Sequence, residues 1–268
     1  MTPNTVHVTG ISLWAPRLPG WQVAAPVLRG EAAVPEPQAT RPAPKLLAAT
    51  ERRRAPDTVA IALEVAARAC ESAGVEPREV ASVFATTHGD LAINDYMSET
   101  LARTPALVSP IRFHNSVLNA AAGYWSIGTG SMQSSTALTA WEDTFGEGLL
   151  EAMTQAEASG RPTLLVAYDI EARGPLATVV TSHGVLGVGV VLTPVPGPGT
   201  LARVRWRTAR GTERTAPLAR NLAAVADNAM AACLPFCEAV ALRQPRTIRV
   251  GLSPSLLLEM EFDFPESP

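Results

Sequence analysis

Short apolar runs alternate along the chain with longer segments in which apolar residues recur at helical spacing. Residues 6–13 alternate apolar and polar side chains, whereas residues 163–168 and 185–192 are almost continuously apolar. The first pattern is typical of a half-buried strand and the second of a strand covered on both faces. We expect further strands at residues 80–87, 134–140, 201–207 and 247–252, with an edge strand at 256–264.

Segments with helical spacing separate most of these strands. The predicted helices are residues 57–74, 91–101, 117–123, 141–156 and about 218–242. The proline-rich residues 16–44 and the polar residues 109–116 are predicted to be irregular. Because strands and helices alternate almost throughout, the pattern predicts parallel βαβ units, with helices on both faces of one sheet.

Composition excludes several classes of protein. The chain has 268 residues, a net charge of -3 and no basic patch, so a nucleic-acid partner is not expected. No apolar run reaches the length of a membrane span and no signal peptide is visible, so we expect a cytoplasmic protein. The three cysteines, Cys70, Cys233 and Cys237, are expected to be buried free thiols rather than disulfides or zinc ligands. We expect no metal and no cofactor.

The most specific motifs lie in residues 111–153, and they include FHNSV at 113–117 and AGYWSI at 122–127. Together with VFATTHGD at 83–90 and LLVAYD at 164–169, they resemble the ketoacyl-synthase-like N-terminal family. Members of that family are chain-length-factor-like subunits of aryl polyene and related type II polyketide synthases.

The resemblance covers roughly residues 5–200 and implies an α/β fold of the thiolase-like (half-thiolase) kind. This fold is a layered α-β-α unit with a mixed, mostly parallel sheet. We therefore expect a ketoacyl-synthase-like domain at residues 1–200, followed by a C-terminal α/β extension of the same unit at residues 201–268.

The resemblance also indicates where a nucleophile would lie. In condensing enzymes a cysteine ends a small-residue strand and opens a helix, whose N-terminus stabilises the thiolate. The equivalent junction here is SSTALTA-WEDTF, which puts Trp141 at that position. An indole cannot form a thioester, no cysteine lies between residues 71 and 232, and no histidine follows residue 200. We expect no catalytic residue, and covalent acyl transfer by the usual route is excluded.

The same resemblance implies a role at an interface. The small residues before Trp141 suit an edge strand that pairs with a partner chain. That partner would be a ketoacyl synthase whose acyl tunnel Trp141 faces, and an acyl carrier protein would bind the complex transiently. The expected tunnel or interface residues are Phe113, His114, Asn115, Tyr124, Trp125, Ser135, Thr136, Ala137, Leu138, Thr139 and Trp141.

The roles of several of these residues have a structural alternative. His114 and Asn115 either contact a carrier or substrate, or they cap a loop. Tyr124 and Trp125 either line a tunnel or pack at an interface. His88 with Asp90 forms either an acid–base pair or a strand-end turn at Gly89, and the turn is the interpretation we favour.

Other functions remain open at this point. A serine acyl hydrolase would use Ser131, Ser134 or Ser135 with His183 as base, although no G-x-S-x-G motif surrounds these serines. The remaining alternatives are a condensing enzyme with an unconventional nucleophile and a stand-alone homodimer that binds acyl groups.

Overall fold

The computed structural model describes residues 4–218 and 222–265. Its strands form one sheet in the order β4-β3-β5-β6-β1-β7-β9-β8, with the short β2 beside β1. The strands are β1 Asn4–Ala15, β2 Leu18–Pro19, β3 Ala81–Ala85, β4 Ser135–Leu138, β5 Thr163–Asp169, β6 Leu186–Thr193, β7 Ala202–Arg210, β8 Arg246–Ser253 and β9 Leu256–Asp263. The strands after residue 200 thus continue the sheet that the earlier strands begin.

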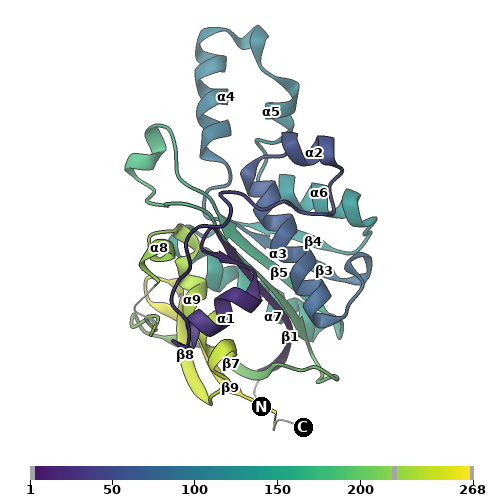
Figure 1. The fold of residues 1–268 in the computed structure, drawn as a ribbon, viewed down its shortest axis with the longest axis vertical. Helices are drawn as coiled ribbons and strands as arrows, with labels where there is room; N and C mark the ends of the chain where they lie inside the picture. Colours follow the sequence, from purple (N-terminus) through teal and green to yellow (C-terminus); the bar gives the residue numbers. More distant parts are fainter. Residues whose placement is uncertain (1–3, 219–221, 266–268) are drawn as a thin grey trace.

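Helices cover both faces of this sheet. They are α1 Trp21–Leu28, α2 Ala49–Arg54, α3 Asp57–Ala73, α4 Leu91–Arg103, α5 Pro110–His114, α6 Ala120–Thr129, α7 Thr144–Ser159, α8 Ala223–Ala226 and α9 Leu234–Leu242. One core cluster lies between the sheet and α3 with α6, and a second between the sheet and α7, α1 and α9. Figure 1 shows α4 and α5 projecting from this body at one end. The layered α-β-α arrangement expected from the sequence is confirmed.

The sheet is mixed, as expected, and its parallel pairs are confined to one side. β3 pairs in parallel with β4 and with β5. Antiparallel pairs join β5 to β6, β6 to β1, β1 to β7, β7 to β9 and β9 to β8. Parallel strands need a crossover connection, and helices supply it between β3, β4 and β5. No long helix separates β5 from β6, so parallel pairing is more limited than the strand–helix alternation predicted.

α3 lies directly on the backbone of the central strands. A Cβ atom at Gly10 of β1 would overlap the carbonyl oxygen of Ala69, and one at Gly189 of β6 would overlap that of Val65. The hydroxyl of Ser12 donates to this same Val65 oxygen at 2.6 Å. Glycine is therefore required where the helix approaches the sheet.

Two segments predicted to be irregular contain helices. α1 lies inside residues 16–44 and packs Ala24, Ala25, Val27 and Leu28 into the core in spite of Pro26. α5 lies inside residues 109–116, where Ser109 accepts a hydrogen bond from the amide of Arg112 at 3.4 Å. Tertiary burial outweighs the local proline signal in the first case, and a side-chain cap starts the helix in the second.

Two other predicted helices differ from the structure. α6 passes through Gly123 and ends at Gly130, whose φ is 67°, because Trp125 anchors the helix in the core. The single helix expected at 218–242 is wrong: the chain breaks at Asn228, then forms the 3₁₀ turn η5 (Ala229–Cys233) and α9. Residues 219–221, inside that expected helix, lie outside the described part.

The last strand, β9, is not an edge strand, because it lies between β7 and β8. The edge is β8, and the loop after β7 runs beside it. The Thr215 amide donates to the Arg249 carbonyl oxygen, and the Arg249 amide donates to the Thr215 hydroxyl, both at 2.9 Å. The outer side of β8 is thus paired at Arg249. Within the described residues, no helix is both long and apolar enough to cross a membrane.

Candidate functional site at the turn between β4 and α7

The chain turns sharply between β4 and α7 at Trp141. Trp141 opens the 3₁₀ turn η3 (Trp141–Asp143) with a φ of 55°, in the left-handed region that bulky L-residues avoid. Its side chain is 54% exposed. Strain of this kind persists only where surrounding contacts hold it, and it concentrates at functional positions. The position that the sequence assigned to a missing nucleophile is therefore a strained, accessible strand-to-helix turn.

Hydrogen bonds on both sides hold this turn. The Thr144 hydroxyl accepts from the Ala140 amide at 2.9 Å and donates to the Trp141 carbonyl oxygen at 2.7 Å. Before the turn, the Thr139 hydroxyl donates to the Thr87 carbonyl oxygen at 2.7 Å. The turn is thereby joined both to the helix that follows and to the strand beside it.

The residues after Trp141 do not favour an anionic nucleophile. Asp143 is the N-cap residue of α7, yet its carboxylate makes no capping hydrogen bond and accepts from Arg214 at 2.7 Å instead. Burial raises the pKa of Glu147, in the first turn of α7, and Asp143 adds to that effect. The start of α7 is therefore acidic, and the residue at the turn, Trp141, has no thiol group.

The three cysteines lie away from this turn and are buried. Cys70 is in α3, where burial raises the pKa of its thiol to about 12. Cys233 and Cys237 lie at the start of α9, and a hydrogen bond between them together with burial raises the pKa of Cys237. With these raised pKa values, the thiols of Cys70 and Cys237 remain protonated and unreactive at neutral pH. The expected buried free thiols are confirmed.

β4, the strand that leads into the turn, is at the edge of the sheet. Ser135 is exposed, Thr136, Ala137 and Leu138 are half-buried, and Thr139, just beyond the strand, is exposed. Its hydroxyls are partly engaged within the chain: Ser82 donates to Ser135 at 3.0 Å, and Gln155 donates to Thr136 at 3.0 Å. The backbone groups on the outer side of this strand remain available to another strand.

A groove of about 530 Å³ lies between α6 and the chain around α2. Phe113, His114 and Tyr124 line it, and the rings of His114 and Tyr124 meet edge-to-face at 6.1 Å. Phe113 is 61% exposed. The groove is large enough for a small molecule or an apolar side chain of a partner.

The other two residues expected here are buried. Asn115 follows α5 as its C-cap, and its side-chain oxygen makes no hydrogen bond to the described part of the chain. Trp125 is 1% exposed and belongs to the core between α6 and α3. Of the aromatic pair, Tyr124 alone reaches the groove, and Trp125 packs in the interior.

A buried polar cluster at the carboxyl ends of β3 and β5 was not predicted. Asp169 ends β5 and is fully buried, and its carboxylate accepts from the Thr86 hydroxyl at 2.8 Å and from the Thr87 amide at 3.0 Å. The Nε2 atom of His88 lies 3.9 Å from its Oδ1 atom. Burial raises the pKa of Asp169, and the nearby His88 opposes that shift. The Asn228 amide group reaches the Asp169 carbonyl oxygen at 3.4 Å.

The carboxylate nearest to His88 is thus Asp169 and not Asp90. Asp90 is the N-cap of α4 and accepts from the Ile93 amide at 3.0 Å, a structural role. Gly89, with a φ of 64°, forms the strand-end turn that the sequence favoured.

The structure separates the serines of the hydrolase alternative from its base. Ser135 begins β4 beside Ser82 of β3, at the amino ends of the strands. His183 lies at the opposite end, where the Asn228 side chain donates to its carbonyl oxygen at 3.1 Å. A five-residue strand spans about 16 Å, so these groups do not form a catalytic pair.

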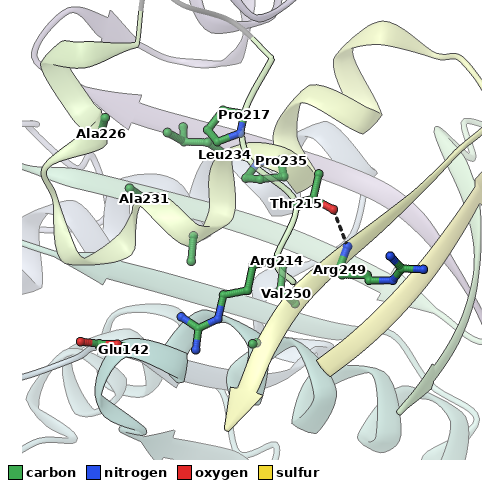
Figure 2. A pocket seen from close by; sticks show the side chains of 13 residues that line it. Glu142, Arg214, Thr215, Pro217, Ala226, Ala231, Leu234, Pro235, Arg249 and Val250 are labelled. Carbon is green, nitrogen blue, oxygen red and sulfur yellow. Dashed lines mark hydrogen bonds between the residues drawn. The ribbon is translucent and has the colours of Figure 1, made fainter. Parts of the chain in front are cut away.

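Figure 2 shows a second cavity, of about 280 Å³, beside the turn. Glu142 lies at one side, Arg214 reaches across it, and Ala231, Pro235 and Val250 form apolar walls. None of the described residues that line it is a cysteine or a histidine. The described residues also contain no cluster of histidine, cysteine and carboxylate side chains that could hold a metal ion.

Exposed large apolar side chains concentrate between residues 101 and 141. They belong to α4, α5, α6 and the segments between them and the turn: Leu101, Leu107, Ile111, Phe113, Val117, Leu118, Ile127, Met132 and Trp141. Scattered exposed apolar residues are ordinary, whereas a concentration of this size marks an interaction surface.

Comparison with known proteins places these features in context. The family model described as beta-ketoacyl synthase, N-terminal domain, matches residues 27–247 and so extends past residue 200. No curated protein matches the sequence.

Several solved structures have a similar fold. A ketosynthase (ApeO) in complex with its chain length factor (ApeC) from Xenorhabdus doucetiae matches with a TM-score of 0.72 and 19% identity, over 96% of this chain and 99% of that chain. The ishigamide ketosynthase/chain length factor matches at 0.71 and 14%, over 97% and 99%. The type II PKS acyl-carrier protein in complex with its ketosynthase bound to the hexaketide (AntDE:AntF) matches at 0.74 and 10%, over 98% and 100%. At these identities the likeness is one of fold.

Proposed function

Because the chain belongs to the family of beta-ketoacyl synthase N-terminal domains, we propose that it is a non-catalytic, chain-length-factor-like subunit. It pairs with a ketoacyl synthase and shapes the acyl tunnel of that complex. The pathway is aryl polyene or related type II polyketide and fatty-acid-like biosynthesis in the cytoplasm. The chain has the thiolase-like, layered α/β fold of the solved ketosynthase complexes, which is the fold expected from its sequence.

The observation that carries this proposal is the indole at the strand-to-helix turn. A condensing enzyme needs a nucleophile at that position, with a helix N-terminus to stabilise its anion. Here the turn is kept in its strained form, while Trp141 stands in place of a nucleophile and Glu142 and Asp143 follow it. A strained turn without a nucleophile suits a subunit that shapes a partner's site.

The edge strand and the apolar segment support a partner of the same fold. Among the described residues, no strand pairs with the outer side of β4, which leads into the turn, and exposed apolar side chains are frequent between residues 101 and 141. Three of the solved neighbours carry ketosynthase, chain length factor or acyl-carrier protein in their descriptions. A ketoacyl synthase is therefore the partner we propose, with an acyl carrier protein as a transient one.

In such a pair, the side chains near the turn would limit the space for the growing chain. Trp141, with Phe113, His114 and Tyr124 of the groove, supplies exposed bulk on the side where β4 would meet its partner. The volume of these side chains would then determine the length of the acyl chain that fits in the tunnel.

The test is reconstitution of this chain with a ketoacyl synthase from the same organism. We expect the two proteins to co-purify as a complex and the Trp141→Ala complex to release products of altered length. Thr208→Ala, at a residue exposed on β7 far along the sheet from β4, is the control. Unchanged product length with Trp141→Ala contradicts the tunnel role, and failure to associate contradicts the proposal as a whole.

A second measurement addresses catalysis by the chain alone. The purified chain is incubated with malonyl- or acyl-loaded carrier protein and its intact mass is measured by mass spectrometry. We expect no mass shift, because the residue at the turn has no nucleophilic atom. Covalent acylation of the chain would favour an active acyl-processing enzyme instead.

A further inference from the structure

The turn at Trp141 is connected to the buried carboxylate of Asp169. Asp169 ends β5, and two atoms at the end of β3 donate to its carboxylate: the Thr86 hydroxyl and the Thr87 amide, the latter at 3.0 and 3.2 Å from its two oxygens. Hydrogen bonds to a buried carboxylate are stronger than those between neutral groups. The end of β3 is therefore fixed by a side chain of the neighbouring strand.

The connection continues from β3 to the turn. The Thr87 carbonyl oxygen accepts from the Thr139 hydroxyl at 2.7 Å, two residues before Trp141. The Thr144 hydroxyl then joins Ala140 to Trp141 from the other side of the turn. Each link joins a different pair of elements, so the turn is held by β5, β3 and α7 together.

This connection explains how Trp141 keeps its backbone conformation. A left-handed conformation is unfavourable for an L-residue, so the turn relaxes unless contacts determine the positions of its neighbours. The hydrogen bonds of Thr139 and Thr144 fix the residues on both sides of Trp141. Trp141 itself is 54% exposed.

We infer that Asp169 is a positioning residue for Trp141, acting through Thr87 and Thr139 to keep the indole directed outward from the turn. The inference rests on the proposed role of Trp141 in the tunnel, and it names the residues that determine where the indole lies. Asp169 itself is fully buried and contacts no substrate.

Thr139→Val tests this connection with the smallest change. Valine has nearly the shape of threonine but cannot donate to the Thr87 carbonyl oxygen. The signal of Trp141 is isolated as the difference in fluorescence between each protein and its Trp141→Phe counterpart. We expect the Thr139→Val change to increase acrylamide quenching of Trp141 and to lower its anisotropy. Thr136→Val is the matched control, because that hydroxyl lies on the same strand but bonds to Gln155; it should leave both signals unchanged.

Asp169→Asn is a second test variant. Asparagine has nearly the shape of aspartate but weakens the hydrogen bonds to the end of β3, so we again expect more acrylamide quenching and lower anisotropy of Trp141. If it does not fold, Thr139→Val alone decides. Unchanged quenching and anisotropy in Thr139→Val overturn the inference and leave the proposed function standing. A changed Trp141 signal, combined with unaltered product length in Trp141→Ala, supports the positioning of Trp141 and contradicts the tunnel role.

Discussion

Gly146 of α7 lies directly against the carbonyl oxygen of Gly251 in β8, so closely that a Cβ atom on Gly146 would overlap that oxygen. Gly251 in turn leaves room for the ion pair between Arg214 and Asp143, which occupies the space where its own Cβ would be. These two glycines let the strands after residue 200 approach the helix that begins at the Trp141 turn.

Gly146→Ala is expected to destabilise the protein by about 1–3 kcal/mol, because the added methyl group must displace the backbone of β8. Gly123→Ala is the matched control. Gly123 also lies inside a helix, but nothing lies within 4 Å of the position that a Cβ atom would take there. Alanine at this position is expected to raise stability by up to about 1 kcal/mol. Urea unfolding measures both, and a neutral Gly146→Ala would show that α7 and β8 separate easily.

Trp141→Gly is expected to be more stable than Trp141→Ala by about 1 kcal/mol. Both variants lose the same indole contacts, whereas glycine alone adopts a φ of 55° without a steric cost. The difference between their unfolding free energies therefore isolates the backbone strain. Equal stabilities would mean that residue 141 relaxes to a negative φ once the indole is removed.

The stability of the protein should respond to pH through Asp169. Because burial raises the pKa of Asp169 above its ordinary value of 3.8, the folded chain binds more protons there than the unfolded chain does. As pH rises from about 3.8 to the raised pKa, the free energy of unfolding falls. Asp169→Asn lacks this contribution. The free energy of unfolding of the wild type minus that of Asp169→Asn, measured by urea unfolding, should decrease as pH rises across that window. An increase would contradict the raised pKa of Asp169.

Glu259 should respond in the opposite sense. Hydrogen bonds from Arg249 and Arg207 lower the pKa of Glu259 below 4.5. Its contribution to stability is present above pH 4.5 and is lost as pH falls through the lowered pKa. Glu259→Gln should therefore destabilise the protein at neutral pH and have little effect in strong acid, as measured by urea unfolding at both pH values.

Glu261→Gln is the control for this prediction. Glu261 lies on the same strand, is half exposed, and pairs with Arg205 at 3.0 Å. Exposed ion pairs of this kind contribute little to stability, so Glu261→Gln should lower the free energy of unfolding at neutral pH less than Glu259→Gln does. An effect of Glu259→Gln that persists unchanged at low pH would show that packing, and not charge, is responsible.

The sequence pattern predicted helices and strands well where the residues that start and end them lie within or next to the element. α3 has its proline start and its glycine end in the sequence, and the strand and helix around Trp141 were visible as small residues followed by helical spacing. Gly123 gave a misleading signal, because the cost of one glycine in a helix is smaller than the gain from burying Trp125.

The contacts of the site could not be predicted in the same way. Thr86 and Asp169 are 83 residues apart, and Arg214 and Asp143 are 71 apart. Thr86 and Asp169 meet because β3 and β5 are neighbours in the sheet, whereas Arg214 and Asp143 meet where α7 packs beside β8. No periodicity in the sequence specifies either arrangement. The sequence therefore offered only the adjacent Asp90 as a partner for His88, as the alternative to the favoured strand-end turn, and Asp90 instead caps α4.

The two edge strands of the sheet, β4 and β8, differ in how far they are already paired, and this difference affects how many chains can associate. On β8, the amide and carbonyl groups of Arg249 already form hydrogen bonds with Thr215. Among the residues that the structure describes, no strand pairs with the outer side of β4. A sheet that can pair with another strand along β4 but is already hydrogen-bonded at Arg249 on β8 favours association of two chains over open-ended growth.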